Sequence, residues 1–320
     1  MSIEIDCHGE SHVGMRRHAN EDQFLIADLN KSMRVHQTSL GLNHQTRLFG
    51  GSQGKLLLVA DGLGGHESGE RASTLAVDGV TNYVLNAMDW VFQLDEHSEA
   101  NFETDLKKAL RHSQEALQNE ADAIPQRRGM ATTLTMAYID WPNFYVVHVG
   151  DTRCYHIRSN KIECLTTDHT LGELTRTANR MSNLAKGQVS KASDESQGSS
   201  RMDNTLYNVI GGSDPGLDPQ VQQSELEVGD ALLLCSDGLT RYVSDDELLE
   251  AIQADDQSAA EICHNLIEKA NQRGGKDNIT VVLAKFSENQ PQQVDHAQAD
   301  QDQTESLLDD TAKHVPSKVS

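Results

Sequence analysis

The sequence has few aromatic residues, few basic residues and no long apolar run, and each shortage excludes a class of protein. Phe, Tyr and Trp make up only 4% of the 320 residues, so part of the chain adds nothing to a hydrophobic core. The 49 acidic residues outnumber the 27 basic ones, which leaves a net charge of −22. Such a surface repels nucleic acid phosphates and anionic lipids, so we expect neither as a partner.

The apolar runs are too short for a membrane-spanning helix. The longest, such as residues 56–60 and 231–235, fall far below the roughly 20 residues that a bilayer requires. Residues 1–6 contain no basic stretch, and no apolar segment follows them, so we expect no secretory signal. The sequence therefore predicts a cytoplasmic protein.

Cysteine is scarce as well. The chain has an odd number of widely spaced cysteines and no Cys-x-x-Cys pair, which fits neither a disulfide framework nor a zinc site. We expect reduced thiols with structural roles at Cys7, Cys154, Cys164, Cys235 and Cys263.

Composition divides the chain into a domain and a tail. Residues 287–320 contain no aromatic residue, six Gln, and seven acidic residues against two Lys. This segment cannot bury enough apolar surface to offset the entropy of ordering it, so we expect a disordered, acidic, Gln-rich tail after a domain at 1–286. Inside that domain, the polar stretch at about 178–205 predicts a flap insertion over about 170–211.

Short apolar or β-branched runs predict strands that are buried on both faces, at residues 56–60, 132–139, 144–149, 231–235 and 279–286. Helical spacing of apolar residues predicts long helices over 68–88 and about 102–117. Ser244 with Glu247, and Ser258 with Glu261, match the capping box and predict two further helix starts. This order of elements favours an α+β fold in which helices cover sheets.

Several aspartates stand beside the predicted strands. Asp61, Asp151 and Asp237 each follow a strand, whereas Asp22 and Asp277 each precede one. A single Asp-Gly pair is commonly only a turn, but several Asp at strand ends with Gly or Asn beside them favour a shared site. Clustered carboxylates repel one another unless cations neutralise them. Oxygen ligands without neighbouring Cys or His favour Mg²⁺ or Mn²⁺ over zinc.

Seven short segments form an ordered series over about residues 10–286. They are RHANED at 17–22, VADGLGGH at 59–66, GMATTL at 129–134, HVGDTR at 148–153, TDH at 167–169, CSDGL at 235–239 and GGKDNIT at 274–280. The series resembles the motifs of the PP2C, or PPM, family of metal-dependent protein serine/threonine phosphatases. Any one segment alone is weak evidence, whereas seven in order are specific. The form with Gly64-Gly65-His66 is similar to the compact bacterial members.

The resemblance implies a four-layer fold, with a central antiparallel β-sandwich flanked by helices and a two-metal site at one end of the sheets. Asp61 would bridge both metals, and Gly62 would offer its carbonyl oxygen. Asp237 and Asp277 would complete the first metal site.

The second metal would be held, partly through water, by Asp22 and Glu21. Asp151 matches the position that, together with Asp237, can hold a third and weaker metal.

The resemblance also implies catalytic roles beside that of Asp61. Arg17 would clamp the substrate phosphate through both arms of its guanidinium, although an ordinary surface pair with Arg16 is the alternative. His66 would act as a general acid, because an alkoxide is a poor leaving group and histidine titrates near neutral pH. Its alternative role is to cap a helix that begins near Glu67. Residues 206–212 depart from the family, whose members commonly have an Arg-containing stretch before Leu-Gly.

The implied activity is the hydrolysis of phosphoserine and phosphothreonine in proteins, by water activated between two Mn²⁺ or Mg²⁺ ions. The partners would be phosphorylated proteins and a cognate Ser/Thr kinase that the enzyme opposes in signalling, and we expect a monomer. Two alternatives stay open. The chain can be a phosphohydrolase of small-molecule phosphates, or a non-catalytic binding module of the same fold. Such modules usually lose metal carboxylates, and here all are present.

Overall fold

The computed structural model describes residues 3–34, 47–65, 67–87, 96–185, 204–212, 216–254 and 257–288. His66 lies outside these residues, and so does the predicted tail apart from its first two residues, which end the last strand.

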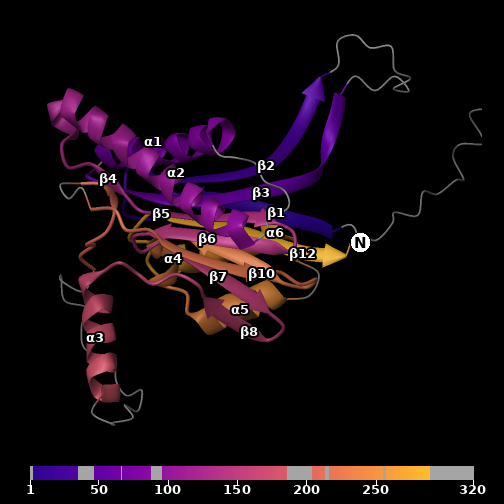
Figure 1. Cartoon of the computed structure of the whole chain (residues 1–320). Helices are drawn as coiled ribbons and strands as arrows, with labels where there is room; N and C mark the ends of the chain where they lie inside the picture. The colour runs from indigo at the N-terminus through magenta and orange to yellow at the C-terminus, as the bar shows by residue number, and fades with distance from the viewer. Residues whose placement is uncertain are drawn as a thin grey trace, which may run out of the picture.

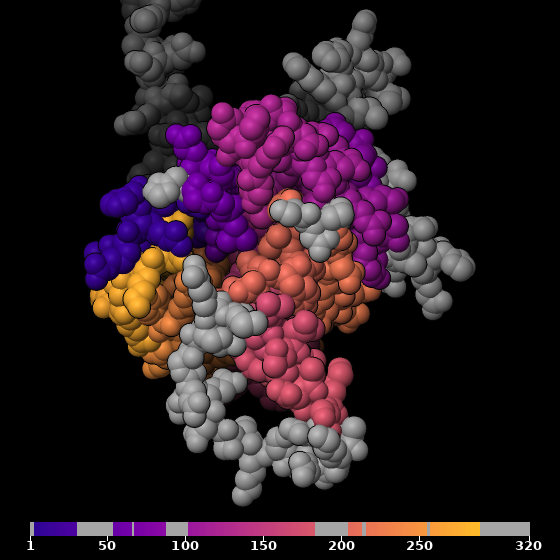
Figure 2. Space-filling model, turned by 90° about the vertical axis from the view of Figure 1, so that its left-hand side faces the viewer, coloured from indigo at the N-terminus to yellow at the C-terminus, as the bar shows by residue number. Residues whose placement is uncertain are grey.

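Five strands form one antiparallel sheet in the order β1-β12-β11-β7-β8. Their bounds are Ile3–His12 (β1), Ile279–Glu288 (β12), Ala231–Cys235 (β11), Arg153–Arg158 (β7) and Lys161–Cys164 (β8). β1 pairs with β12 from Ile3 opposite Glu288 to His12 opposite Ile279. The first and last strands of the described chain therefore lie side by side, as the indigo and yellow residues of Figure 2 show.

Seven strands form the second sheet in the order β10-β6-β5-β3-β4-β9, with β2 also paired to β3. Their bounds are Asp22–Arg34 (β2), Arg47–Leu63 (β3), Ala131–Thr132 (β4), Leu134–Asp140 (β5), Asn143–Val149 (β6), Ile210–Gly211 (β9) and Gln220–Glu225 (β10). All five predicted strands occur in the two sheets, although a break at Thr133 divides the one predicted at 132–139 into β4 and β5.

Helices cover the outer face of each sheet (Figure 1). The seven-stranded sheet packs against α1 (Glu67–Asn86) and α2 (Glu96–Ala123), and the five-stranded sheet against α5 (Asp245–Gln253) and α6 (Ala259–Gln272). The layers confirm the predicted α+β fold with a central antiparallel sandwich. None of the described helices is long and apolar enough to cross a lipid bilayer.

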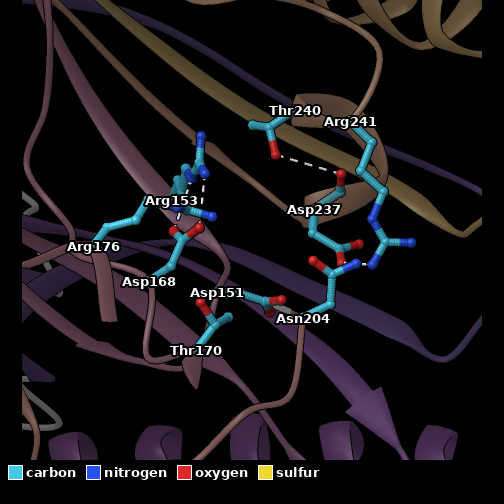
Figure 3. Close-up of a pocket in the computed structure, with 9 residues that line it drawn as sticks. All are labelled: Asp151, Arg153, Asp168, Thr170, Arg176, Asn204, Asp237, Thr240 and Arg241. Carbon is cyan, nitrogen blue, oxygen red and sulfur yellow. Dashed lines mark hydrogen bonds and ion pairs between the residues drawn. The ribbon is translucent and has the colours of Figure 1, made fainter. Parts of the chain in front are cut away.

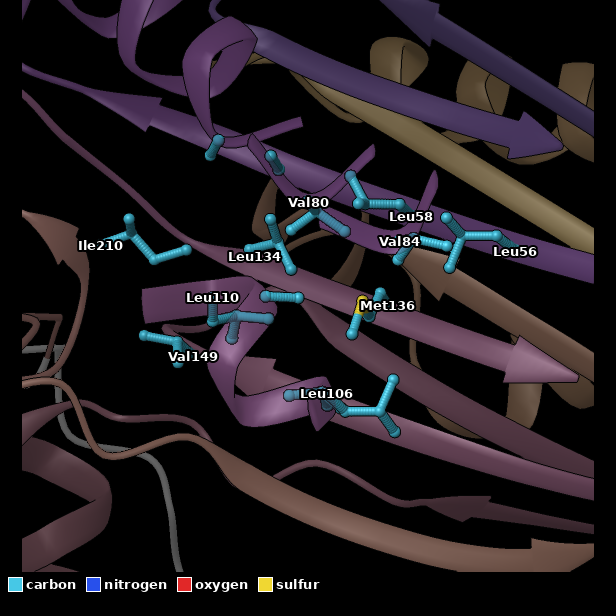
Figure 4. Packing of buried hydrophobic residues seen from close by; sticks show 14 of the residues in the cluster. Leu56, Leu58, Val80, Val84, Leu106, Leu110, Leu134, Met136, Val149 and Ile210 are labelled. Atoms are coloured by element: carbon cyan, nitrogen blue, oxygen red, sulfur yellow. The ribbon is translucent and has the colours of Figure 1, made fainter. Parts of the chain in front are cut away.

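Alternating side chains along the central strands hold these layers together. In β3, Leu56 and Leu58 belong to the cluster that α1 and α2 cover (Figure 4), whereas Leu57 and Val59 lie between the two sheets. All four are buried, and each contributes about 2 kcal/mol by leaving water. Burial on both faces explains why these strands read as continuous apolar runs.

The capping boxes predicted at the starts of α5 and α6 are confirmed. The Ser244 hydroxyl accepts the backbone N–H of Glu247, whose carboxylate accepts the backbone N–H of Ser244. Ser258 and Glu261 form the same pair of bonds. Each cap stabilises its helix by about 1 kcal/mol and so fixes where the helix begins.

Part of the predicted flap is helical. A helix, α3 (Leu171–Ala185), occupies the first part of the stretch expected to be a polar loop from residue 178, and residues 186–203 lie outside the described part. α3 extends away from the sheets (Figure 1). Its turns are supported by ion pairs of Glu173 with Arg176 and Arg180, at 2.6 and 3.5 Å, more than by packing. Leu174 and Met181 lie at helical spacing along α3 but are exposed, so this helix forms without burying its apolar residues.

Candidate metal centre

Two of the predicted metal-site aspartates face each other across a strand pair. Asp22 is the first residue of β2, and it lies opposite Asp61, near the end of β3. In an antiparallel pair the end of one strand meets the start of its neighbour, which explains why residues so far apart in sequence meet. β3 continues through Asp61 to Leu63, so this residue lies within the strand and not after it as predicted.

The other sheet supplies Asp237 and Asp277. Asp237 starts a short helix, α4 (Asp237–Thr240), directly after β11, and Asp277 lies just before β12. β11 and β12 are antiparallel neighbours, with Cys235 opposite Val281, so the two aspartates also lie at one end of their sheet.

Hydrogen bonds of Asp22 join the two sheets at this end. Its Oδ2 accepts the hydroxyl of Ser236 at 2.8 Å and that of Thr280 at 2.7 Å, both from the five-stranded sheet side. Ser236 and Thr280, which belong to the motifs that contain Asp237 and Asp277, thus orient a carboxylate of the opposite sheet.

Burial and mutual repulsion make these carboxylates hold protons in the absence of cations. Burial, followed by the neighbouring carboxylates, raises the pKa of Asp22 to about 7 and that of Asp151 to about 8. Burial likewise raises the pKa of Asp237 to about 6, and the nearby Arg241 opposes this rise. The pKa of Asp61 is raised well above its usual range by burial and then by the charges of Asp22 and the three other aspartates.

The donor set fits a hard divalent cation. Asp22 Oδ1 and Asp237 Oδ1 are buried and have no hydrogen-bond partner, which is costly for a carboxylate unless a cation binds it. In the described ranges, no three His, Cys, Asp or Glu side chains are already gathered closely enough to hold an ion. Arginines instead hold Asp237 and Asp277.

Glu21 and Gly62 lie directly beside this cluster. The Glu21 backbone N–H donates to Asn278 Oδ1 at 2.8 Å, and its carbonyl accepts the N–H of Gly62 at 3.2 Å. A Cβ on Gly69 would lie 2.0 Å from Glu21 Oε2, so the Glu21 carboxylate occupies the space that this glycine leaves in the first turn of α1. A helix N-terminus favours a negative charge there.

Two arginines at the rim contact the metal-site aspartates. Arg17 lies at this end, with Nε 2.8 Å from Asp277 Oδ1. Arg241, which sequence reasoning missed, pairs with Asp237 and with Asp277, the latter at 3.0 Å. The available signal was its position four residues after Asp237, which places both on one side of a helical turn.

Asp151 lines a pocket of about 150 Å³ next to Asp237 (Figure 3). Beside it, Arg153 binds Asp168 through two hydrogen bonds, of 2.8 and 2.7 Å. The complete lining is Asp151, Arg153, Asp168, Thr170, Arg176, Asn204, Asp237, Thr240 and Arg241. The pocket thus extends from the aspartate cluster to α3.

His66 lies outside the described residues, between Gly65 and the first residue of α1. Its role as a general acid and its alternative as a helix cap both stay predictions.

Cys235 and Arg241 have the Cys-x5-Arg spacing that a cysteine-dependent phosphatase requires. Cys235, however, is fully buried in β11 within the core under α5 and α6. Burial raises the pKa of its thiol far above the physiological range, so no thiolate nucleophile forms. The spacing is therefore incidental, and Cys235 is a core residue.

Comparison with known proteins identifies the family. The family model described as Protein phosphatase 2C matches residues 41–284, and the chain belongs to this family. It is 30% identical to the serine/threonine protein phosphatase PstP of Mycobacterium tuberculosis over 283 residues, which cover 87% of this chain and 49% of PstP. It is 32% identical to the protein phosphatase PhpP of Streptococcus pneumoniae over 266 residues, which cover 82% of this chain and 97% of PhpP. The chain thus spans about half the length of PstP.

Solved structures of relatives share the fold. The crystal structure of the Mycobacterium tuberculosis PstP phosphatase matches with a TM-score of 0.65 at 28% identity, over 89% of this chain and 99% of that one. A structure of the PstP catalytic domain in complex with two manganese ions matches with a TM-score of 0.64 at 27% identity, over 90% of this chain and all of that one.

Proposed function

We propose that the protein hydrolyses phosphoserine and phosphothreonine in other proteins, with the aid of two divalent cations, Mn²⁺ or Mg²⁺. The observation that carries this proposal is the pair of buried, partnerless carboxylate oxygens on Asp22 and Asp237, in a cluster of aspartates contributed by both sheets. Membership of the protein phosphatase 2C family and the names of the relatives support the substrate class.

Each predicted ligand has a position that suits its proposed role. Asp61, whose charge interacts with all four other aspartates, would bridge the two ions. Asp237 and Asp277 would hold the first ion with the Gly62 carbonyl. Asp22, with Oδ1 free and Oδ2 fixed by two hydroxyls, would hold the second ion with Glu21.

When bound, two such ions lower the pKa of a shared water and offset the charge of the phosphoryl oxygens. The chain's own residues orient the reacting groups. Arg17 is half exposed at the rim of the cluster, where its guanidinium fork would bind two oxygens of the phosphoryl group. His66 would donate a proton to the leaving serine or threonine oxygen.

We further propose that residues 1–286 are the phosphatase domain and that 170–211 form its flap. The protein would act as a cytoplasmic monomer on phosphoproteins made by a cognate Ser/Thr kinase. The negative net charge of −22 argues against nucleic acid or anionic lipid as a partner.

Phosphate release from several substrate classes tests the proposal. Metal-stripped protein is assayed with phosphoserine and phosphothreonine peptides, nucleotides and sugar phosphates, with Mn²⁺ or with EDTA, and Asp237→Asn serves as the control. We expect release from the phosphopeptides only with Mn²⁺ and only by the unaltered protein. Preferential hydrolysis of nucleotides or sugar phosphates would identify a small-molecule phosphohydrolase, and no release from any substrate would identify a binding module.

A further inference from the structure

We propose that the guanidinium of Arg241 takes the place of a third divalent ion beside Asp151 and Asp237, so that this protein binds two metal ions and not three. The inference rests on the proposed function and deepens it, because it concerns the same metal centre.

Arg241 is held against the metal centre by its backbone and by its side chain. It directly follows α4, and its backbone N–H donates to the carbonyl of Asp237 at 3.0 Å. Its Nη2 contacts Asp237 Oδ2, and its Nη1 lies 3.0 Å from Asp277 Oδ2. Moving this guanidinium would therefore break its ion pairs with Asp237 and Asp277.

The same guanidinium lies in the pocket that Asp151 and Asp237 share (Figure 3). A positive charge beside two carboxylates that face one small pocket reduces their mutual repulsion. The other arginines of the pocket are paired elsewhere, Arg153 with Asp168 at 2.7 Å and Arg176 with Glu173 at 2.6 Å. Among the arginines that line the pocket, Arg241 is thus the one that pairs with Asp237 and Asp277.

At Asp237, this position leaves one oxygen for the two-ion site. Arg241 binds Oδ2 of Asp237, whereas Oδ1 of the same carboxylate is buried without a partner and stays available to a metal ion. Oδ2 of Asp237 therefore binds the guanidinium, and Oδ1 can bind a metal ion.

A third ion would have to displace this guanidinium. A divalent cation that binds between Asp151 and Asp237 would lie next to a fixed positive charge and would compete with it for Asp237 Oδ2. Like charges at short range in a partly buried site repel strongly. Metal loading should therefore end at two ions, with no weaker phase at millimolar metal.

The number of bound ions tests the inference without a measurement of catalytic activity. Protein stripped with EDTA is titrated with Mn²⁺, binding is followed by calorimetry, and free Mn²⁺ is counted by electron paramagnetic resonance. We expect two ions for the unaltered protein and three for Arg241→Gln, with the third lost again when Asp151→Asn is added. Arg241→Lys, which keeps a positive charge, should bind two.

Arg176→Ala is the matched control, because it removes an arginine from the same pocket that pairs with Glu173 and not with Asp237. It should also bind two ions. Circular dichroism and a melting curve show that each variant is folded.

Three ions on the unaltered protein, or two on folded Arg241→Gln, would overturn the inference. A protein that binds no ion would contradict the proposed function instead, so the two failures are distinguishable.

Discussion

The guanidinium of Arg17 contacts both carboxylate oxygens of Asp277, with Nε 2.8 Å from Oδ1 and Nη2 3.0 Å from Oδ2. Arg17 follows β1 and Asp277 precedes β12, and the pairing of these two strands brings the residues together. A phosphoryl group presents paired oxygens much as a carboxylate does. The same forked geometry would allow Arg17 to bind two oxygens of a phosphoryl group, which is its proposed role.

Replacing Arg17 should weaken substrate binding. A hydrogen bond to a charged group is worth about 1.5–3 kcal/mol, so Arg17→Ala should raise KM for a phosphothreonine peptide about 10- to 100-fold. Initial rates over a range of peptide concentrations give KM. Arg16→Ala, which changes the neighbouring surface arginine, is the control and should leave KM unchanged. Equal KM values for the two variants would show that Arg17 is an ordinary surface residue.

Asp237→Asn should abolish binding of the first ion, and with it activity, while the fold persists. A neutral amide is a poorer ligand for a hard cation than a carboxylate. Asp151→Asn, in contrast, should keep two ions bound and slow turnover, because Asp151 is not proposed to hold either of them. Bound Mn²⁺ is measured after dialysis, together with phosphate release and a melting curve. Full activity of Asp237→Asn would rule out the two-ion site, and an unchanged rate for Asp151→Asn would show that Asp151 has no role in turnover.

In the metal-free protein, the contribution of Asp22 to the free energy of unfolding should fall as pH rises. Burial and neighbouring carboxylates raise the pKa of Asp22 from 3.8 to about 7. A carboxyl group with a raised folded-state pKa stabilises the fold fully below its unfolded pKa, and this contribution is lost as pH rises through the folded value. We therefore expect the melting temperature of metal-free protein, relative to metal-free Asp22→Asn, to fall between about pH 4 and pH 7.

Burial lowers the pKa of His148 to about 3, which has the opposite effect on the pH dependence of stability. Because His148 is present in both proteins, the comparison with Asp22→Asn removes this effect. Mn²⁺ should raise the melting temperature more at about pH 7 than at about pH 5, because protons compete with the cation for the carboxylates. Parallel melting curves of the two proteins at all pH values would show that Asp22 does not titrate in this range.

Sequence patterns predicted the metal centre better than the residues around it. Asp22 begins its strand as predicted, whereas Asp61 lies within β3 and not after it, and antiparallel pairing brings the two together. Arg241 was missed because α4 spans only Asp237–Thr240, too short to show a periodic pattern, and a lone arginine resembles any surface charge. The unpartnered oxygen of each buried aspartate depends on side-chain orientation, which no sequence pattern encodes.

Elements whose apolar residues are buried could be predicted from the sequence, whereas an element whose apolar residues are exposed was predicted less well. The runs at 231–235 and 279–286 predicted β11 and β12 because both faces of these strands are buried. In α3, Leu174, Ala178 and Met181 recur at helical spacing, but Leu174 and Met181 are exposed, and the polar residues between them led us to expect a polar stretch from residue 178.

The role of His66 can be decided with two leaving groups. An alkoxide needs a proton donor, whereas p-nitrophenolate leaves without one, and general acid catalysis contributes about 10²–10⁴-fold. His66→Ala should therefore impair phosphopeptide hydrolysis far more than p-nitrophenyl phosphate hydrolysis, with no loss of bound metal. If His66 only caps α1, both substrates should be affected alike and the melting temperature should fall.

The central claim is that bound divalent cations activate the water that attacks the phosphoryl group. The most direct test measures the initial rate of phosphate release from a phosphothreonine peptide by metal-stripped protein, as Mn²⁺ is added back and bound ions are counted in the same samples. We predict no release in excess EDTA and a rate that rises with occupancy until two ions are bound. Full activity in excess EDTA, or a rate independent of bound Mn²⁺, would contradict it.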